Sequence, residues 1–156
     1  MPTKQEAQKI LNDLIETCKD GEQGFKVAAE KIKDRSLKAL FEKYSWQRAQ
    51  YVIELQDLVA QMGSDPATSG HISGALHRGW INLKEAFSRN DDQAIVDECE
   101  AGEDAAVKSY GDALKSQLPA EIATIVQRQY KGIQLAHAVV RDLKHGRAAT
   151  AAATRI

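Results

Sequence analysis

The chain has 156 residues, of which 43% are hydrophobic and 28% charged, which is ordinary for a globular protein with one core. Its formal net charge of −1 gives no electrostatic basis for binding nucleic acid or anionic lipid. No apolar run approaches the ~18 residues of a membrane span, and the N-terminus lacks the apolar segment of a secretory signal. We therefore expect a cytoplasmic protein that has neither nucleic acid nor membrane as a partner.

The apolar residues recur three or four positions apart, and no segment shows the period of two that marks a strand. A capping box from Thr3 to Glu6 predicts the start of the first helix. Asp34 can cap a second helix, and Gly63 suits its end after Met62. The apolar stripe of the first helix comprises Leu11, Ile15, Cys18, Phe25, Ala29 and Ile32.

A loop rich in turn formers follows over residues 64–70, and a shorter amphipathic stretch over 72–87 contains Trp80, which we expect to anchor it on the other helices. Asp91 and Asp92 supply caps for the next long helix, and Pro119 suits the first position of the last one. From Gly146 the apolar periodicity stops. These signals predict a single domain over residues 1–145 and a flexible tail over 146–156.

The lengths of the connections predict how the helices are arranged. Short turns join the first long helix to the second and the third to the fourth, so each pair forms an antiparallel hairpin. The link between the hairpins holds the short helix, which at 1.5 Å per residue spans ~24 Å and returns most of the way along a bundle. The predicted fold is an all-α four-helix bundle with one long crossover containing a short helix.

A five-residue pattern occurs on the opening helix of each hairpin: CKDGE from Cys18 to Glu22, and CEAGE from Cys99 to Glu103. We interpret the repeat as a sign of two related hairpins. The cysteines fit the apolar stripes as small core residues, and a disulfide between them stays open. The glutamates are the anomaly, because an acid on a core stripe costs several kcal/mol unless it is paired, protonated or bound to a metal.

Partners for the two acids can be sought at the same depth in the bundle. Glu22 is level with Gln47 and Gln50 on the second helix, counted from the turn at Asp34. Glu103 is level with the two polar residues Gln134 and His137 on the last helix, counted from Pro119. Each acid is therefore expected to face a polar pair spaced i, i+3 near the middle of the bundle.

An acid on each of two helices with an E-x-x-H pair on each of the others is the metal-site pattern of ferritin-like di-iron proteins, which this chain resembles. It is most similar to a small bacterial ferritin-like family of unknown function. The resemblance covers roughly residues 3–145. It is carried by the run from Asp20 to Phe25, the segment from Arg48 to Leu55, the run from Gly102 to Asp104, and His137.

The resemblance implies a candidate degenerate metal site, in which glutamines replace the expected ligands. Its residues are Glu22, Gln47, Gln50, Glu103, Gln134 and His137. Two acids and one imidazole supply too little charge for a di-iron centre. One interpretation is a hydrogen-bonded network in which Arg48 binds an acid bidentately. The other is a mononuclear zinc or iron held by Glu22, Glu103 and His137.

Three functions follow from these interpretations. We expect a non-enzymatic ferritin-like protein with a structural, stress-related or interaction role, without a cofactor and as a homo-oligomer, with a dimer favoured. The alternative is a metal-binding protein or oxidase that uses zinc or iron in the reduced site. The third is a helical module that holds a small apolar ligand between its helices. The sequence identifies no protein partner.

Overall fold

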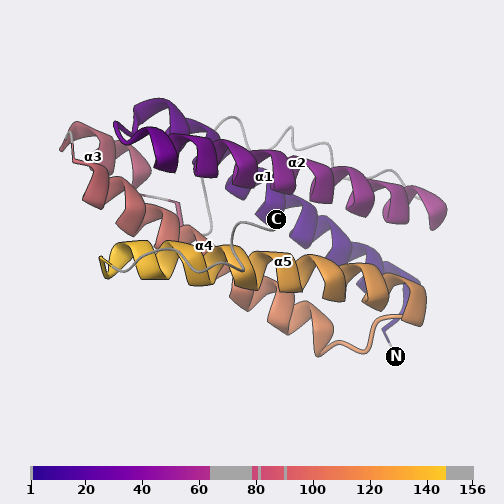
Figure 1. Ribbon diagram of the computed structural model, residues 1–156. Helices are drawn as coiled ribbons and strands as arrows, with labels where there is room; N and C mark the ends of the chain where they lie inside the picture. Colours follow the sequence, from indigo (N-terminus) through magenta and orange to yellow (C-terminus); the bar gives the residue numbers. More distant parts are fainter. Residues whose placement is uncertain (1, 64–78, 81, 90, 147–156) are drawn as a thin grey trace.

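The structure, a computed structural model, describes residues 2–63, 79–80, 82–89 and 91–146. In this part of the chain every regular element is a helix (Figure 1), and none combines the length and apolar character that a membrane span needs. The helices are α1 (Lys4–Lys31), α2 (Arg35–Gln61), α3 (Leu83–Ser88), α4 (Asp92–Leu114) and α5 (Ala120–Lys144). The four long helices lie where the apolar stripes predict them.

The crossover differs from the prediction in its described part. We expected a helix over residues 72–87, whereas the described helix there, α3, has six residues and begins at Leu83. The earlier part of that predicted helix, like the predicted loop over 64–70, lies outside the described residues. The predicted tail does too, apart from Gly146.

Local capping explains where the long helices begin. The Thr3 hydroxyl accepts from the backbone N–H of Glu6 in the predicted capping box, and Asp34 caps α2 through the N–H groups of Ser36 and Leu37. Asp91 caps α4. Asp92 reaches further: its carboxylate accepts from the backbone N–H groups of residues 33 and 34, at 2.9 and 3.0 Å. The start of α4 is thereby tied to the turn between α1 and α2.

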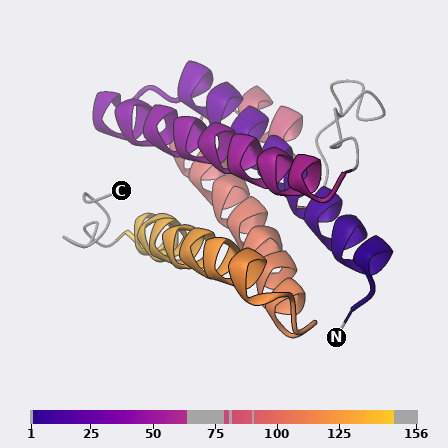
Figure 2. The same ribbon diagram turned by 90° about the vertical axis from the view of Figure 1, so that its right-hand side faces the viewer.

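The colour ramp of Figure 1 shows that α1 and α2 run antiparallel, as do α4 and α5, while α2 and α4 point the same way. This agrees with the two predicted hairpins. The hairpins meet mainly through α1 and α4, whereas α2 and α5 touch at few points. In Figure 2, α2 and α5 lie apart from each other.

The apolar core has two halves, one toward each end of the bundle. On α2, the half that contains Phe41 ends at Tyr44 and the other begins at Tyr51; on α4 the corresponding limits are Cys99 and Ala106. The buried residues between these limits include Gln47, Arg48 and Glu103. A polar layer therefore crosses the middle of the bundle, at the depth that the sequence predicts.

Trp80 joins the crossover to the helices, as expected, although it precedes α3 instead of lying within a helix. Its side chain is buried and lies against Gly24 of α1 and Gly102 of α4. A Cβ atom at either glycine would overlap the indole ring. The ring also meets Phe25 edge-on, with centroids 5.1 Å apart. These glycines are therefore needed for the close approach of Trp80, which offsets the cost of glycine in a helix interior.

Candidate functional site

The centre of the polar layer is an ion pair between Arg48 of α2 and Glu103 of α4. Nη1 and Nη2 of Arg48 donate to Oε1 and Oε2 of Glu103 at 2.6 and 2.7 Å. The two side chains are 1% and 0% exposed. This is a bidentate, fully buried pair, the strong geometry for a guanidinium and a carboxylate. The sequence interpretation that Arg48 binds an acid bidentately is confirmed for Glu103.

The surroundings of Arg48 hold its guanidinium in one orientation. Its Nε donates to Oε1 of Gln47 at 3.1 Å, and its Cζ lies 5.4 Å from the centre of the Phe25 ring. Gly21 leaves room for the side chain, since a Cβ atom there would come within 3.1 Å of Nη1. Packing and hydrogen bonding from α1 and α2 thus aim the guanidinium at α4.

Electrostatics favour the charged form of Arg48. Burial opposes the charged form of Arg48, but the negative charge and hydrogen bonds of Glu103 outweigh it and raise the pKa of the guanidinium. Both partners are desolvated, so each depends on the other for compensation of its charge. The pair is a fixed structural dipole between α2 and α4.

A second polar chain connects all four long helices on the other side of this layer. The Cys18 Sγ lies 3.0 Å from the Tyr110 hydroxyl, which donates to Oε1 of Gln129 at 2.7 Å. The Nε2 of Gln129 donates to Oε1 of Glu54 at 2.9 Å, and Arg128 pairs with the other oxygen of that carboxylate. Buried polar groups that are satisfied in this way fix the relative placement of the helices.

Both cysteines are free and buried, in agreement with their prediction as core residues. Burial raises the pKa of the Cys18 thiol to about 11, with the Tyr110 hydrogen bond opposing the rise, and raises that of Cys99 as well. A protonated buried thiol is a poor nucleophile and a poor metal ligand. The cysteines therefore contribute packing to this site and no reactive group.

Glu22 does not lie in the interior, although its spacing on the apolar stripe of α1 predicts that it does. The buried position between Cys18 and Phe25 is filled by Gly21, and Glu22 is half-buried in a groove between α1 and α2 that Trp46 also lines. Partial burial raises the pKa of its carboxyl group, while nearby lysines oppose the rise. The reason is steric, because the side chain of Arg48 crosses α1 where a larger residue would stand.

The predicted glutamines also separate. Gln47 is buried beside Arg48, whereas Gln50 is half-buried in the groove between α2 and α5. Gln134 is exposed on α5. The expectation that Glu103 faces Gln134 and His137 is wrong, since the carboxylate of Glu103 turns to Arg48 instead.

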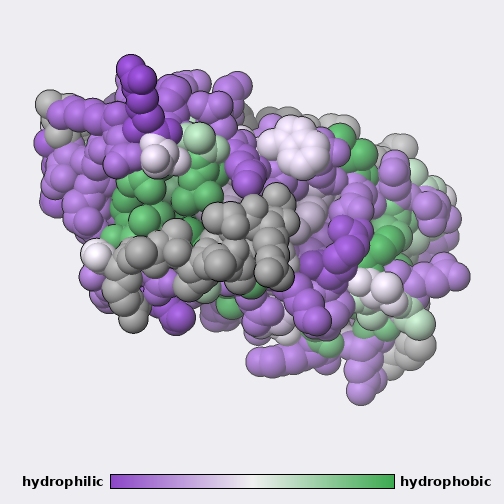
Figure 3. All heavy atoms as spheres, in the orientation of Figure 1, coloured by the Kyte–Doolittle hydropathy of each residue, from purple (hydrophilic) through white to green (hydrophobic). Residues whose placement is uncertain are grey.

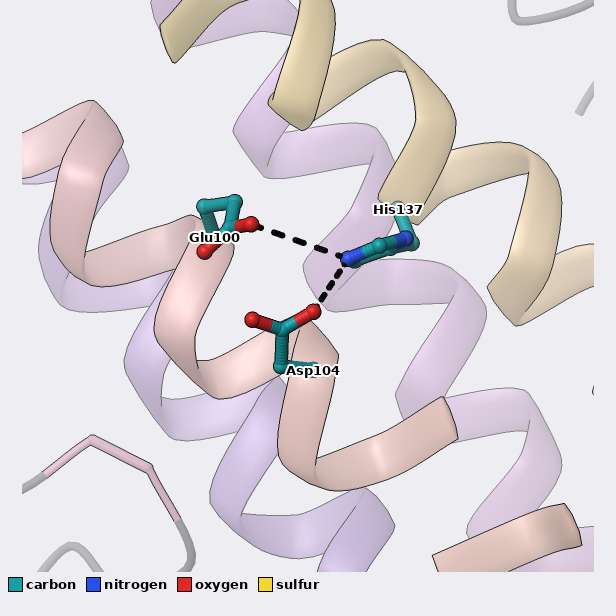
Figure 4. Close-up of side chains that lie close together, drawn as sticks. All are labelled: Glu100, Asp104 and His137. Carbon is teal, nitrogen blue, oxygen red and sulfur yellow. Dashed lines mark hydrogen bonds and ion pairs between the residues drawn. The ribbon is translucent and has the colours of Figure 1, made fainter. Parts of the chain in front are cut away.

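His137 meets two acids on the neighbouring helix, as Figure 4 shows. Its Nε2 lies 2.5 Å from Oδ1 of Asp104 and 3.9 Å from Oε1 of Glu100. Glu100 and His137 are 12% and 16% exposed, whereas Asp104 is 59% exposed. Lys144 adds a cation 3.6 Å from the other oxygen of Glu100. Among the described residues, Glu100, Asp104 and His137 offer ligand atoms that all lie within 4.8 Å of one another.

The polar layer does not fit a di-iron centre, nor the degenerate metal site of Glu22, Glu103 and His137 that the family resemblance implies. Both oxygens of Glu103 are occupied by the guanidinium, whose Nε is bonded in turn to the neutral amide of Gln47. A metal of charge +2 or more at Glu103 would lie against this fixed cation, and both oxygens of the carboxylate are already bonded to it. Glu22, Glu103 and His137 point to three different surroundings and form no common ligand set.

Sequence reasoning missed Gln129 and the hydrogen bonds by which it links Tyr110 to Glu54. Gln129 could have been found, because it fills the vacant stripe position between Val126 and Ile133 on α5. Asp104 is the last residue of the run from Gly102, and Glu100 lies four residues before it, so the two acids share one helical face. That they meet His137 depends on how α5 is rotated about its axis, which the sequence does not give.

Fold and site together define a protein whose described elements are all helices and whose interior polar layer contains a buried ion pair. The chain belongs to the family described as domain of unknown function (DUF2383), whose model matches residues 6–116. The match includes both partners of the ion pair and Trp80, and it ends before α5 begins. A comparison with curated proteins finds no match for this chain.

Proposed function

We propose that this protein is a ferritin-like bundle, a single domain over residues 1–145, in which the Arg48–Glu103 pair stands where a metal centre would lie. On this proposal it is not an enzyme and serves as a structural or interaction protein. The two antiparallel hairpins, with α4 parallel to α2 across the crossover, support the ferritin-like connectivity. The observation that carries the proposal is the bidentate, buried ion pair.

A guanidinium can replace a metal in the architecture but not in the chemistry. It supplies a positive charge and directed donors that tie α2 to the Glu103 carboxylate of α4. It has no accessible redox states and no open coordination position. An interior arranged in this way stabilises the hairpin pair and leaves the surface to carry the biological role.

The test is a metal and oxidation assay on protein purified without chelator. We expect Fe(II) oxidation in air at the rate of buffer alone, and no iron that depends on interior residues. More than about half a metal per chain, lost in Glu103→Gln but kept in Gln134→Ala, would overturn the proposal. Gln134 is a matched control because it is exposed on α5. The oxidation rate of the unmodified protein decides the point even where a variant fails to fold.

A second candidate function is zinc binding at the surface triad of Glu100, Asp104 and His137. One nitrogen and two carboxylate oxygens within 4.8 Å, with water as a fourth ligand, match the donor set of an open zinc site. The ion pairs of His137 with Asp104 and of Lys144 with Glu100 compete with the metal. Zinc would therefore have to displace both contacts.

Zinc titration against a competing chelator tests this candidate. The expected result is one saturable site per chain, lost in His137→Ala and kept in His145→Ala, since His145 is an exposed histidine at the end of the same helix. Titration without saturation, or equal binding by both variants, would refute it. Neither result bears on the interior ion pair.

A further inference from the structure

The outward face of α2 carries a stripe that packing among the described residues does not explain. Its members lie alternately four and three residues apart, on the side away from the buried face, and all are exposed or half-buried. A stripe with this mean spacing of 3.5 residues is typical of helices that pack lengthwise against another helix. Its members are Ala39, Lys43, Trp46, Gln50, Ile53, Asp57 and Ala60.

The stripe contains the most exposed large apolar side chains of the described residues. Trp46 is 66% exposed and Ile53 is 52% exposed, and both line the groove between α2 and α5. Leu135 of α5, 41% exposed, lines the same groove, which has a volume of about 570 Å³. Figure 3 shows hydrophobic atoms at the surface between these two helices. Exposed apolar groups gathered in this way mark an interaction site.

The order of residues in the stripe identifies the partner, because the stripe is self-complementary when reversed. About a two-fold axis at Gln50, an antiparallel second copy places Trp46 at the height of Ile53, and Lys43 at the height of Asp57. The small residues Ala39 and Ala60 face each other at the two ends. Apolar groups then meet apolar groups, and each lysine meets an aspartate.

The charges also select the orientation. A parallel pairing in register would place Lys43 beside its own copy and Asp57 beside its own copy, which is unfavourable. The antiparallel pairing replaces these repulsions with two symmetric attractions. Gln50 on the axis can bond its own copy, and a polar residue that pairs with itself in this way helps to fix the register. This complementarity favours a second copy over an unrelated helix or a small ligand.

We propose that the protein forms a two-fold homodimer in which α2 packs antiparallel against α2 of a second copy, with Gln50 on the axis and Leu135 at the edge. The inference names the partner for the interaction role proposed above and rests on that role. It concerns the outer face of α2, whereas the proposed loss of a metal centre concerns the inner face. The two can therefore fail separately.

Single-cysteine cross-linking tests both the face and the register, since the native cysteines are buried. On mild oxidation, Gln50→Cys should give a disulfide-linked dimer, because the two new thiols meet on the axis. Lys43→Cys should not link to itself but should link when mixed with Asp57→Cys chains. Self-linking of Lys43→Cys would indicate a parallel pairing, and a monomeric unmodified protein in sedimentation equilibrium would overturn the dimer.

Charge reversal tests the antiparallel register independently, through the affinity of dimerisation. Lys43→Asp and Asp57→Lys each turn two attractions into two repulsions, so each should weaken dimerisation about 10- to 30-fold. Combining both substitutions in one chain should restore the affinity to within about threefold, because the pairs reform with reversed signs. Lys108→Asp, an exposed lysine of α4, is the control and should leave the affinity unchanged. Single variants that dimerise normally would overturn the register.

Discussion

Removing the interior carboxylate charge is the most direct perturbation of this fold. Glu103→Gln keeps the size of the side chain but leaves the Arg48 guanidinium, 1% exposed, without a counterion. Breaking a buried pair from one side costs about 3–5 kcal/mol, out of a total stability of about 5–15 kcal/mol for a domain. The melting temperature should fall by roughly 6–20 °C, at 2–4 °C per kcal/mol for a domain of this size.

Urea unfolding followed by circular dichroism at equilibrium measures this cost. The double variant Arg48→Met, Glu103→Leu removes both charges and should lie within about 2 kcal/mol of the unmodified protein. Its residual cost comes from the lost contacts of Arg48 with Gln47 and Phe25. A Glu103→Gln cost below about 1 kcal/mol, typical of exposed pairs, would refute the reasoning. So would additive costs of the two single changes, since a coupled pair must deviate from additivity.

Other predictions follow from the packing and from the thiols. Gly102→Ala should destabilise the protein by about 1–3 kcal/mol in the same urea assay, because the new Cβ overlaps Trp80. Gly111→Ala should stabilise it by about 0.5–1 kcal/mol, because the new Cβ has ordinary space 3.5 Å from Tyr130 Oη and alanine favours the helix. The pKa of Cys18 rises from 9.0 to about 11 on folding, so the folded state holds the thiol proton more tightly than the unfolded state does. The protein therefore keeps this stabilisation in full below pH 9 and loses about 2–3 kcal/mol of stability as the pH rises through 11. Unfolding at a series of alkaline pH values tests this: the unmodified protein should lose more stability than Cys18→Ala, and parallel curves would contradict it.

The sequence predicts the long helices and the depth of the polar layer because both depend on local information. Capping residues such as Asp34 act within one turn, and stripes with a period of 3.6 residues determine which side of a helix is buried. Arg48 and Glu103 both occupy stripe positions, so their burial is readable from spacing alone. Once two opposite charges are buried at one depth, their pairing follows from the cost of leaving either unpaired.

Spacing alone could not predict that Gly21, and not Glu22, occupies the buried position on α1. Both positions lie within one residue of the stripe, so spacing does not decide between them. The decision depends on the path of Arg48 from the neighbouring helix, a tertiary contact. The convergence of His137 with Asp104 likewise depends on the rotation of α5 about its axis, which the i, i+3 pairing with Gln134 predicted incorrectly.

The two copies of Cys-x-x-Gly-Glu therefore have different roles although their letters agree. In the second copy, Gly102 receives Trp80 and Glu103 receives Arg48, so one turn of α4 holds both the crossover and α2. In the first copy the glycine gives room to the arginine, and Glu22 faces a groove at the surface. Glu22→Gln should then change stability by less than about 0.5 kcal/mol, as for a surface substitution.

This variant makes the same chemical change as Glu103→Gln at the equivalent repeat position, so the two form a matched pair. Equal unfolding costs for both would mean that the two acids serve the interior alike, and the assignment of a single internal ion pair would be wrong. A large cost at Glu103 with a negligible one at Glu22 would show that, of the two repeated glutamates, only Glu103 has an interior role. The difference in cost between the two sites is therefore a direct measure of how far the two hairpins have diverged in their interior chemistry.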